Sequence, residues 1–346
     1  MNALSGRKPH PLGTHRVIDP PGAMPQSAWK LDSTPVACEN EMLCDVDVLN
    51  IDSASFKQIA DACDASETRI AEHVRSIVRE RGKMHNPVTG SGGMFIGRNR
   101  ATGERIASLV SLTLTPLHIE SIERVDVATG RIWIRGSAIL FASGLWAALP
   151  DDIDENVALA VLDVAGAPAQ VQRLCEPGQT VVIIGADGKS GMLSCAQAKA
   201  RAGSSGRVVA VAPSSETAAA KLLREYGYVD AFVVADARDA LDISEKVAAA
   251  APQLADVTIN CVNVPGTELG SILCTKENGT VYFFSMSTSF TAAALGAEGV
   301  GKDVTMIVGN GYARGHAQTA LQTLRDHPPI HTYFREKYAA TKESAR

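Results

Sequence analysis

Short apolar runs alternate with alanine-rich stretches between residues 177 and 309, and this alternation constrains the fold more than any other feature of the sequence. The apolar runs are rich in valine and isoleucine and lack a polar face, which is typical of strands buried on both sides of a sheet. The stretches between them are predicted to be helices, so neighbouring strands run parallel. Six strands are predicted, at residues 180–184, 207–212, 231–235, 257–261, 280–284 and 304–308.

Six strands joined by five helical crossovers predict an α/β fold with a doubly wound, parallel Rossmann sheet in the order 3-2-1-4-5-6. Two of the crossover helices have marked ends, because Gly203 follows residues 192–202 and Gly227 follows residues 217–226. Helices commonly end in a residue of positive φ, which glycine adopts without strain. Both glycines therefore support the predicted helix boundaries.

The sequence before residue 140 has a different texture. Strand-like runs at 42–49, 105–114 and 131–134, with one amphipathic helix at 67–79, predict a compact β-rich domain. Near the other end, residues 316–324 predict a helix that Pro328 and Pro329 end. We therefore expect a substrate domain over residues 1–139, a Rossmann domain over 140–311, and a helical tail over 312–346 that returns to the substrate domain.

The first predicted strand leads into the loop GADGKSG at residues 185–191, a pattern that favours a dinucleotide site. Gly185 permits the tight turn, Gly188 lets the backbone approach a pyrophosphate, and Gly191 lets the next helix pack close to the strand. Free amides at the helix N-terminus then favour an anion. The other side chains predicted to serve this site are Asp187, Lys189 and Ser190.

Two alternatives apply to this loop. Glycines at this spacing also mark turns that are purely structural, but the strand–loop–helix context and the six-strand cadence favour the cofactor. A mononucleotide phosphate loop has the form GxxxxGK(S/T), and the loop does contain GKS. That motif needs a glycine where Ile183 stands, so we reject it.

The end of the second predicted strand bears on the choice between NAD and NADP. An NAD site usually places Asp or Glu there, where the carboxylate binds the ribose diol. This strand instead ends in Ala212-Pro213-Ser214-Ser215, and the two hydroxyls can accommodate a 2′-phosphate. NADP is therefore slightly favoured, although Glu216 is close enough to leave NAD open. Ser214 and Ser215 can also simply cap the next helix.

The loops after the fourth and fifth strands normally flank the nicotinamide half of the cofactor in this fold. We expect backbone groups to make most of the contacts there. The Cys261 thiol is not expected to be a nucleophile, because no activating base is close in the sequence. The residues predicted at these loops are Cys261, Val262, Asn263, Ser285, Met286 and Ser287.

Composition argues against several classes of function. Aromatic residues make up 5% of the chain and the formal net charge is −5, neither of which suits a nucleic-acid surface. No apolar run approaches the roughly 18 residues of a membrane-spanning helix, and the start of the chain lacks the apolar core of a signal peptide. The seven cysteines contain no CxxC pair, so neither a disulfide framework nor a clustered zinc site is expected. These features predict a cytoplasmic protein without nucleic-acid or membrane partners.

A β-rich domain before a GxxGxxG Rossmann sheet resembles the medium-chain dehydrogenase/reductase superfamily, whose first domain is GroES-like. The loop spacing resembles that of its quinone reductases. In zinc-dependent members, a loop cysteine and a His-Glu pair bind the catalytic metal. The corresponding stretches here read NIDSAS at 50–55 and PVTGSGG at 87–93, which contain none of these ligands. The resemblance therefore implies a zinc-free member without a metal site, in which protein groups polarise the substrate.

Three segments resemble one family more closely: GTHRVIDPPGAMPQSAW at 13–29, NIDSASF at 50–56 and GKMHNPVTGSGGM at 82–94. They are similar to the L-erythro-3,5-diaminohexanoate dehydrogenases of bacterial lysine fermentation, and the similarity extends from residue 13 through the cofactor loop. The resemblance implies NAD(P)-dependent oxidative deamination. In that reaction the C3 amine becomes a ketone, which gives 5-amino-3-oxohexanoate, ammonia and reduced cofactor.

The matched segments carry polar residues suited to a diamino-acid substrate. The chemistry needs a base for the C3 ammonium, a group that activates water and a cation for the carboxylate. Asp52 and His85 are the predicted proton carriers, although Asp52 can also be an Asx-turn residue and His85 a structural histidine. The remaining catalytic candidates are Ser53 and Asn86.

The residues predicted to bind substrate are Arg16, Lys83, Thr89 and Ser91. Arg16 and Lys83 are candidates for the carboxylate, because a guanidinium or an ammonium can bind it directly. An arginine near a chain terminus is, however, more often a solvated or interdomain contact. Thr89 and Ser91 are expected to orient water or substrate.

Two other functions stay open. A zinc-free NADPH-dependent quinone or enoyl reductase would share the GxxGxxG loop and the missing metal ligands. A non-catalytic nucleotide-binding protein would keep the fold and bind cofactor without turnover. By analogy with the superfamily, we expect a homodimer in which the apolar edge strand at 304–308 pairs with its copy.

Overall fold

The structure, a computed structural model, describes residues 8–285, 287–309 and 311–339, except for the side chains of Ser53 and Ala54. Contacts between Cα atoms divide the chain into two compact units, Met1–Pro150 and Asp151–Arg346. Each unit has its own sheet and its own hydrophobic core. Within the described ranges, no helix combines the length and the apolar character needed to cross a membrane.

The second unit is built on a six-stranded parallel sheet. Its order is β11-β10-β9-β12-β13-β14, which confirms the predicted order 3-2-1-4-5-6. Every residue of the central strand β9 (Thr180–Ile184) is buried, as a strand covered on both faces requires. The other strands are β10 (Arg207–Ala212), β11 (Ala231–Val234), β12 (Ala255–Asn260), β13 (Thr275–Phe283) and β14 (Thr305–Val308).

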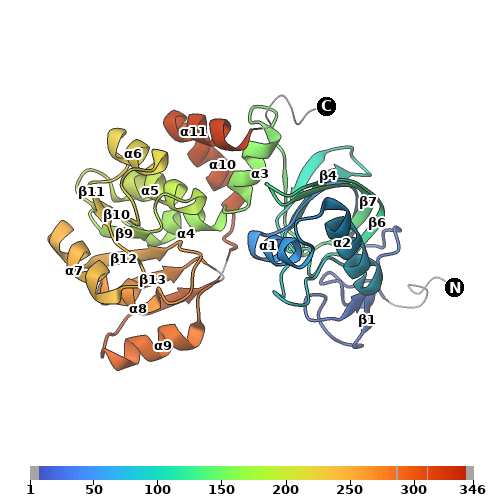
Figure 1. The fold of residues 1–346 in the computed structure, drawn as a ribbon, viewed down its shortest axis with the longest axis horizontal. Helices are drawn as coiled ribbons and strands as arrows, with labels where there is room; N and C mark the ends of the chain where they lie inside the picture. Colours follow the sequence, from blue (N-terminus) through green and yellow to red (C-terminus); the bar gives the residue numbers. More distant parts are fainter. Residues whose placement is uncertain (1–7, 286, 310, 340–346) are drawn as a thin grey trace. The chain divides into compact units, whose positions relative to one another are not determined.

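Helices cover both faces of this sheet (Figure 1). On one face lie α5 (Lys189–Ala202) and α6 (Ala218–Glu225), and on the other lie α7 (Ala240–Ala250), α8 (Glu268–Leu273) and α9 (Phe290–Gly299). Buried valines and isoleucines of β9 and β10 form one core with α7. Gly203 and Gly227 follow α5 and α6 with φ of +67° each, as predicted.

Helices outside the strand–helix cadence complete this unit: α3 (Glu155–Leu162), α4 (Gly166–Leu174), α10 (His316–Asp326) and α11 (Pro328–Tyr338). α10 packs against α3, α4 and α5, and α11 packs against α3 and α6. The apolar side of α10 therefore lies in the second unit, whereas the sequence-based division placed the tail with the first domain. Pro328 and Pro329 follow the predicted helix, but they also begin α11, because proline fits the first turn of a helix.

The first unit contains a six-stranded antiparallel sheet in the order β6-β7-β3-β4-β5-β8. β3 (Glu41–Asn50) pairs with β7 (Arg131–Phe141) on one side and with β4 (Met94–Asn99) on the other. The sheet also includes β6 (Leu117–Asp126), β5 (Arg105–Ser108) and β8 (Trp146–Ala148). β7 ends after residue 139 and all of β8 follows that residue. The sheet of the first unit therefore extends beyond the domain boundary predicted there.

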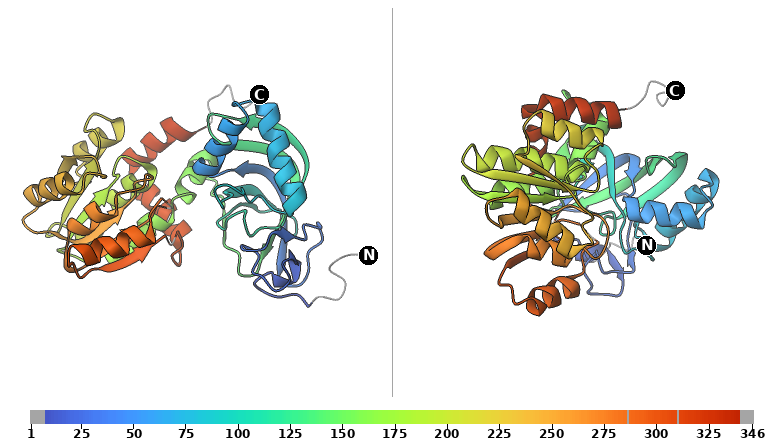
Figure 2. Two further views of the ribbon diagram at one scale, coloured as in Figure 1. Left: turned by 60° about the horizontal axis from the view of Figure 1, so that its bottom comes forward. Right: turned by 60° about the vertical axis from the view of Figure 1, so that its left-hand side comes forward.

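Two helices, α1 (Ser53–Ala62) and α2 (Glu67–Arg81), and a ribbon of β1 (Val17–Asp19) and β2 (Lys30–Leu31) lie beside this sheet. The light-blue α2 packs along β6 (Figure 2). Its predicted apolar face is buried in the core of the unit. α2 ends at Gly82, where a Cβ atom would lie 2.0 Å from the carbonyl oxygen of Leu31. Only glycine therefore allows α2 to end this close to β2.

A buried ion pair fastens the N-terminal segment to the sheet. Arg16 ends the 3-10 helix η1 (Thr14–Arg16) and donates two hydrogen bonds of 2.6 Å to the carboxylate of Glu41, the first residue of β3. Its other donors reach the carbonyl oxygens of Asp32, Thr34 and Val36. All five N–H groups of the guanidinium thus have acceptors in the protein, and both charged side chains are fully buried.

We expect Glu41→Gln to lower the free energy of unfolding by about 3–5 kcal/mol, because it leaves the buried Arg16 charge without a counter-charge. Burial acts to raise the pKa of Glu41, but the hydrogen bonds from Arg16 lower it on balance. A lowered carboxyl pKa stabilises the fold above the unfolded value, and this stabilisation is lost as the pH falls through the folded value. Urea unfolding at pH 7 and at decreasing pH would measure both effects.

Asp45→Asn is the matched control for Glu41→Gln. Asp45 also pairs with an arginine, Arg100, but both side chains are about half exposed. An exposed pair contributes roughly 0–1 kcal/mol, so this change should alter unfolding little. Equal effects of the two substitutions would contradict the role assigned to Glu41.

Candidate functional site

The predicted cofactor loop lies between the end of β9 and the start of α5, and close contacts require glycine at two of its positions. A Cβ atom on Gly191 would lie 2.1 Å from the carbonyl oxygen of Gly185. Gly185 has a φ of +80°, which other residues rarely adopt. Gly188 is the N-cap of α5 and provides no side-chain cap, so the first amides of the helix are available to an anion. These features fit the pyrophosphate of a dinucleotide.

The polar side chains of this loop interact mainly with the protein. Lys189 Nζ donates to Asp163 Oδ2 at 2.6 Å, and the two side chains are 30% and 35% exposed. Asp187 Oδ2 accepts from Thr217 Oγ1 at 3.5 Å, the long limit of a hydrogen bond, and Ser190 is buried. The backbone amides, rather than a free lysine charge, are therefore the groups that this loop offers to a phosphate.

The turn after β10 contains the two predicted serines, and two cations of α6 that the sequence did not indicate lie beside it. Ser214 Oγ accepts from the amide of Glu216 at 3.1 Å, and Ser215 Oγ donates to the Glu216 carboxylate at 3.1 Å. Arg224 of α6 donates to the carbonyl oxygen of Ser215 at 2.6 Å, and Lys221 forms an ion pair with Glu216 at 3.1 Å. The serines therefore shape this turn, and positive charge lies beside it.

The loops after β12 and β13 lie together, as the predicted topology requires. Asn263 Oδ1 accepts from Ser285 Oγ at 3.2 Å and from Ser287 Oγ at 2.9 Å. A Cβ atom on Gly185 would lie 3.0 Å from Val262 Cγ2, so the loop after β12 also meets the loop after β9. The structure thus brings three of the predicted cofactor segments to one edge of the sheet.

Cys261 and Met286 are also among the residues predicted at these loops. Burial raises the pKa of the Cys261 thiol to about 11, so the thiol is protonated at neutral pH and is a poor nucleophile, in line with the sequence prediction. Met286 lies outside the described residues, and its predicted contact with the cofactor stays a prediction.

Buried polar side chains behind the same loops were missed in the sequence. Asn260, the last residue of β12, accepts from the amide of Val262 at 2.9 Å and donates to Thr267 Oγ1 at 2.8 Å. Glu268 accepts from the amide of Ser289 at 2.7 Å. Both side chains hold the ends of loops that carry predicted cofactor residues. The available signal was a polar residue at the end of an otherwise apolar strand.

In the first unit, Asp52 and Ser91 are hydrogen-bonded. Asp52 is the N-cap of α1, with Oδ1 accepting from the amide of Ser55 at 2.9 Å and Oδ2 accepting from Ser91 Oγ at 2.7 Å. The stretch 50–55, expected to be a loop, therefore includes the start of a helix, because the Asp52 carboxylate satisfies a free amide of its first turn. The side chain of Ser53 lies outside the described part of the structure.

The loop of residues 86–91 is tied to α1 and to itself. Asn86 Nδ2 donates to Gln58 Oε1 at 2.8 Å, and the hydroxyls of Thr89 and Ser55 are 2.6 Å apart. The amide of Asn86 donates to the carbonyl oxygen of Ser91 at 2.9 Å, which closes the loop. We call this group the Asp52 cluster, and its members are Asp52, Ser55, Gln58, Asn86, Thr89 and Ser91. Ser55 and Gln58 are the members that the sequence analysis missed.

The other predicted site residues of this unit are less available to a substrate. Arg16 has all five donors engaged by the protein. Lys83 is fully buried, and its Nζ donates to the carbonyl oxygens of Pro25 at 2.8 Å and Gln26 at 3.0 Å. Burial and the nearby Arg81 lower the pKa of Lys83 to about 8.

His85 immediately precedes the loop of the Asp52 cluster and is half-buried. Burial and the charges of Lys83 and Arg81 lower its pKa to about 4. The sequence analysis expected an imidazole that titrates near neutrality, but this ring is neutral throughout the physiological range and is a weak base. Its Nδ1 atom is buried and has no hydrogen-bond partner.

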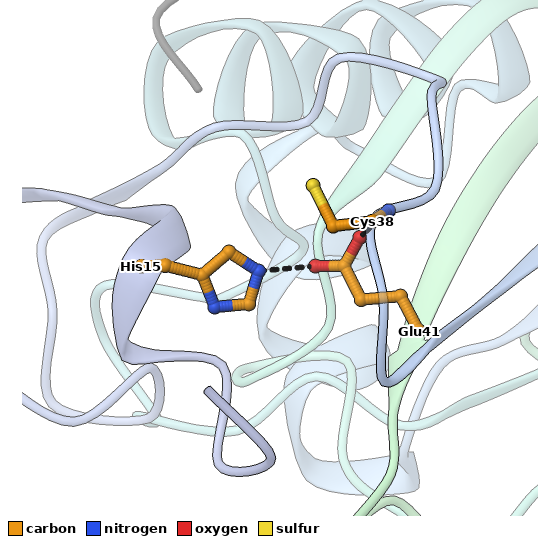
Figure 3. A group of neighbouring side chains, drawn as sticks. All are labelled: His15, Cys38 and Glu41. Atoms are coloured by element: carbon orange, nitrogen blue, oxygen red, sulfur yellow. Dashed lines mark hydrogen bonds and ion pairs between the residues drawn. The ribbon is translucent and has the colours of Figure 1, made fainter. Parts of the chain in front are cut away.

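Among the described residues, His15, Cys38 and Glu41 form a group close enough to suggest a metal site, with candidate ligand atoms within 4.8 Å of one another (Figure 3). Glu41, however, accepts from His15 Nε2 at 2.7 Å, from the amide of Cys38 at 2.7 Å and from both ends of the Arg16 fork. These bonds occupy its lone pairs, and the adjacent guanidinium repels a cation. We therefore assign this group to the buried ion pair of Arg16 rather than to a metal.

Comparison with known proteins gives concordant results over almost the whole chain. A family model described as the L-erythro-3,5-diaminohexanoate dehydrogenase N-terminal domain matches residues 15–150. The L-erythro-3,5-diaminohexanoate dehydrogenase of Acetoanaerobium sticklandii is 51% identical over 339 residues, which cover 94% of this chain and 98% of that protein. The chain belongs to the L-erythro-3,5-diaminohexanoate dehydrogenase family. The family member from Fusobacterium nucleatum is 48% identical over the same share of both chains.

Solved structures support the fold of this diaminohexanoate dehydrogenase family member. The CurK enoyl reductase superposes with a TM-score of 0.50 at 15% identity, covering 89% of this chain and 81% of that one. A mycobacterial quinone oxidoreductase gives a TM-score of 0.50 at 14% identity, covering 92% and 87%. At this identity the likeness concerns the fold alone, and it confirms the predicted fold of a β-rich domain and a Rossmann sheet in one chain.

Two glycine substitutions separate cofactor binding from folding in this diaminohexanoate dehydrogenase family member. The nearest atom to a Cβ on Gly188 would be the Gly185 carbonyl oxygen at 3.5 Å, an ordinary contact. Gly188→Ala should therefore leave the melting temperature nearly unchanged and weaken dinucleotide binding about tenfold or more, because the methyl group occupies space at the anion site. Calorimetric titration with NAD and NADP would measure the affinity.

Gly191→Ala is the contrasting variant. Its Cβ atom would lie 2.1 Å from the Gly185 carbonyl oxygen, so α5 has to move away from β9. We expect a loss of stability of about 1–3 kcal/mol together with the loss of affinity. Unchanged dinucleotide affinity in both variants would contradict the cofactor site.

Proposed function

We propose that the protein oxidises L-erythro-3,5-diaminohexanoate to 5-amino-3-oxohexanoate and ammonia, with NAD or NADP as the acceptor. The observation that carries this proposal is the near-full-length identity of 51% and 48% to two L-erythro-3,5-diaminohexanoate dehydrogenases. The reaction removes a hydride and a proton from the substrate and replaces its C3 nitrogen by an oxygen from water. Oxidised cofactor, substrate with its C3 ammonium, and water give the keto acid, ammonium, reduced cofactor and one proton.

A bound nicotinamide cofactor would accept the hydride from C3. Gly185, Gly188 and Gly191 leave room for its pyrophosphate, and the start of α5 offers amides to it. NADP is favoured over NAD because no acid ends β10, and because Arg224 and Lys221 place positive charge beside the Ser214–Ser215 turn. Glu216, paired with Lys221, keeps NAD as the alternative.

Asp52 is the proposed base for the C3 ammonium. A protonated amine has no lone pair to assist hydride departure, so a proton must leave first. The Ser91 hydroxyl, 2.7 Å from Asp52 Oδ2, is placed to pass a proton between substrate and carboxylate. The negative charge of Asp52 also attracts a substrate that carries two ammonium groups.

Hydrolysis of the resulting iminium requires an oriented water molecule. The hydroxyls of Ser55 and Thr89 and the amide group of Asn86 are proposed to hold it. Asp52 first releases the proton of the C3 ammonium to solvent, then accepts the proton of this water and returns it to the departing amine. His85, whose pKa is about 4, is neutral at this stage and accepts a hydrogen bond without adding positive charge beside the two cationic nitrogens of the substrate. Its proposed role is therefore to orient rather than to carry the proton.

The purified protein should reduce NAD or NADP with L-erythro-3,5-diaminohexanoate and release one ammonia for each reduced cofactor. Near-ultraviolet absorbance and an ammonia assay measure the two products. Oxidation of NADPH by quinones or enones without reaction of the diamine would favour a reductase instead. Cofactor binding without turnover of either substrate class would favour a non-catalytic protein. Loss of activity with a chelator and its return with zinc would overturn the zinc-free interpretation.

Asp52→Asn should lower kcat by about 100- to 10,000-fold, because asparagine cannot accept the substrate proton. Asparagine is as good an N-cap as aspartate, so α1 and the melting temperature should change little. Asp61→Asn changes an exposed acid of the same helix, paired with Lys57, and should leave both properties unchanged. Turnover of the Asp52 variant close to that of the unaltered protein would exclude Asp52 as the base.

We also propose a cytoplasmic homodimer that serves lysine fermentation. β14 is an edge strand of the parallel sheet, and Val308 on it is exposed. The adjacent α9 exposes Phe290 and Leu295, so apolar surface continues beyond the edge. Light scattering at micromolar concentration should give twice the mass of one chain, and a monomeric mass would contradict the proposal.

A further inference from the structure

Two cations are buried close together where α2 ends, and no described carboxylate forms an ion pair with either. Arg81, in the last turn of α2, is 7% exposed, and Lys83 is fully buried. The Lys83 ammonium donates only to the backbone carbonyl oxygens of Pro25 and Gln26. Glu80, exposed on the same helix, is the acid whose field reaches Arg81. Among the described residues, this buried positive charge is therefore offset by backbone carbonyl dipoles and by the exposed Glu80.

The guanidinium of Arg81 has one edge without partners in the described structure. The ring of Trp29 covers its face, with 4.0 Å between the Arg81 Cζ atom and the ring centroid. Nη1 donates to the carbonyl oxygen of His85 at 2.5 Å. Nε is buried without a hydrogen-bond partner, and Nη2 makes no hydrogen bond within the described residues. The Nε–Nη2 edge is one on which a carboxylate binds an arginine through two parallel hydrogen bonds.

Arg81 differs in this respect from Arg16, the other deeply buried arginine of the unit. Arg16 has a carboxylate partner and no donor left, whereas Arg81 has neither a carboxylate partner nor a full set of acceptors. A buried N–H group without an acceptor costs about 1–3 kcal/mol, and more when it is charged. Such a group calls for an explanation, and a functional role or a bound water or ion is among the usual ones.

We propose that Arg81 binds the carboxylate of the substrate through its Nε–Nη2 edge, with Lys83 adding positive charge behind it. This inference rests on the proposed function, because it assigns the anionic end of the same substrate. Arg81 is bonded to the backbone of His85, and the next residue begins the loop that is hydrogen-bonded to Asp52. The segment 81–91 thus has a positive end at Arg81 and is tied to a negative group at Asp52. A β-amino acid carries the complementary charges, a carboxylate and a C3 ammonium.

Binding of a small β-amino acid tests this assignment without any turnover. The probe is 3-aminobutanoate, and isopropylamine is the same molecule without the carboxylate. In histidine-labelled protein, with the His85 resonance assigned from His85→Gln, 3-aminobutanoate should shift the imidazole signal of His85 and isopropylamine should not. No shift with 3-aminobutanoate, or equal shifts with both probes, would overturn the proposal.

Arg81→Gln should weaken 3-aminobutanoate binding at least tenfold, and Arg75→Gln, an exposed arginine of the same helix, should not change it. If circular dichroism shows that Arg81→Gln does not fold, Arg81→Lys is the substitute variant. Lysine keeps the positive charge but cannot donate two parallel hydrogen bonds to a carboxylate, so binding should weaken several-fold. Unchanged binding in a folded Arg81 variant would show that Arg81 is only structural. If the protein binds the probe but does not oxidise the diamine, the anion site at Arg81 is supported and the proposed function is contradicted.

Discussion

The second unit depends on how closely α5 approaches β9. β9 is the central strand of the parallel sheet, with β10 on one side and β12 on the other, and the strand order reverses between β9 and β12. Ligands of such sheets bind beyond the carboxyl ends of the strands at this reversal. A side chain at residue 191 would enter the backbone of Gly185, push the start of α5 away and remove its amides from the site. The close approach therefore sets both the packing of the unit and the position of the groups that meet a phosphate.

In the first unit, the corresponding constraint is electrostatic. The positive charge of Arg16 is balanced by Glu41 and fully hydrogen-bonded, so it fixes the N-terminal segment and offers nothing to a ligand. Positive charge at Arg81 and Lys83 is buried without such balance, and burial together with these charges lowers the pKa of His85. The Asp52 cluster supplies negative charge at the start of α1. The ion pair of Arg16 and Glu41 thus stabilises the fold of the unit, whereas Arg81 and Lys83, which have no ion pair among the described residues, lie in the region that we assign to the substrate.

Much of the second unit was predictable because its signals are local. Runs such as TVVII end at glycines or polar residues, and the alanine-rich stretches between them fix the number of strands and their direction. Pro328 shows where local signals fail, since a proline that follows one helix also suits the first turn of another. The start of α1 lacks a comparably strong signal, because Asp52 suits an N-cap and an Asx turn equally well and no Glu or Gln follows it at the third helical position.

The site in the first unit was predicted only in part, for a different reason. Asp52, Asn86, Thr89 and Ser91 were chosen because they stand in the matched segments, and the structure brings them together. Arg16 was chosen by the same criterion, but its partner Glu41 is 25 residues away, and no sequence pattern shows that they meet. Nothing in the sequence distinguishes Arg81, because an arginine in the last turn of a helix usually interacts with solvent. Which cation is paired depends on tertiary contacts.

The contact between the loops after β9 and β12 has a consequence for how this protein can vary. The space that a side chain at residue 185 would need is already taken by Val262 and by the backbone of Cys261. A larger residue at 262 would therefore press on the turn at 185, and relief at one position depends on the other. Substitutions in either loop, whether designed or arising in evolution, therefore have to be compatible with the residues of the other.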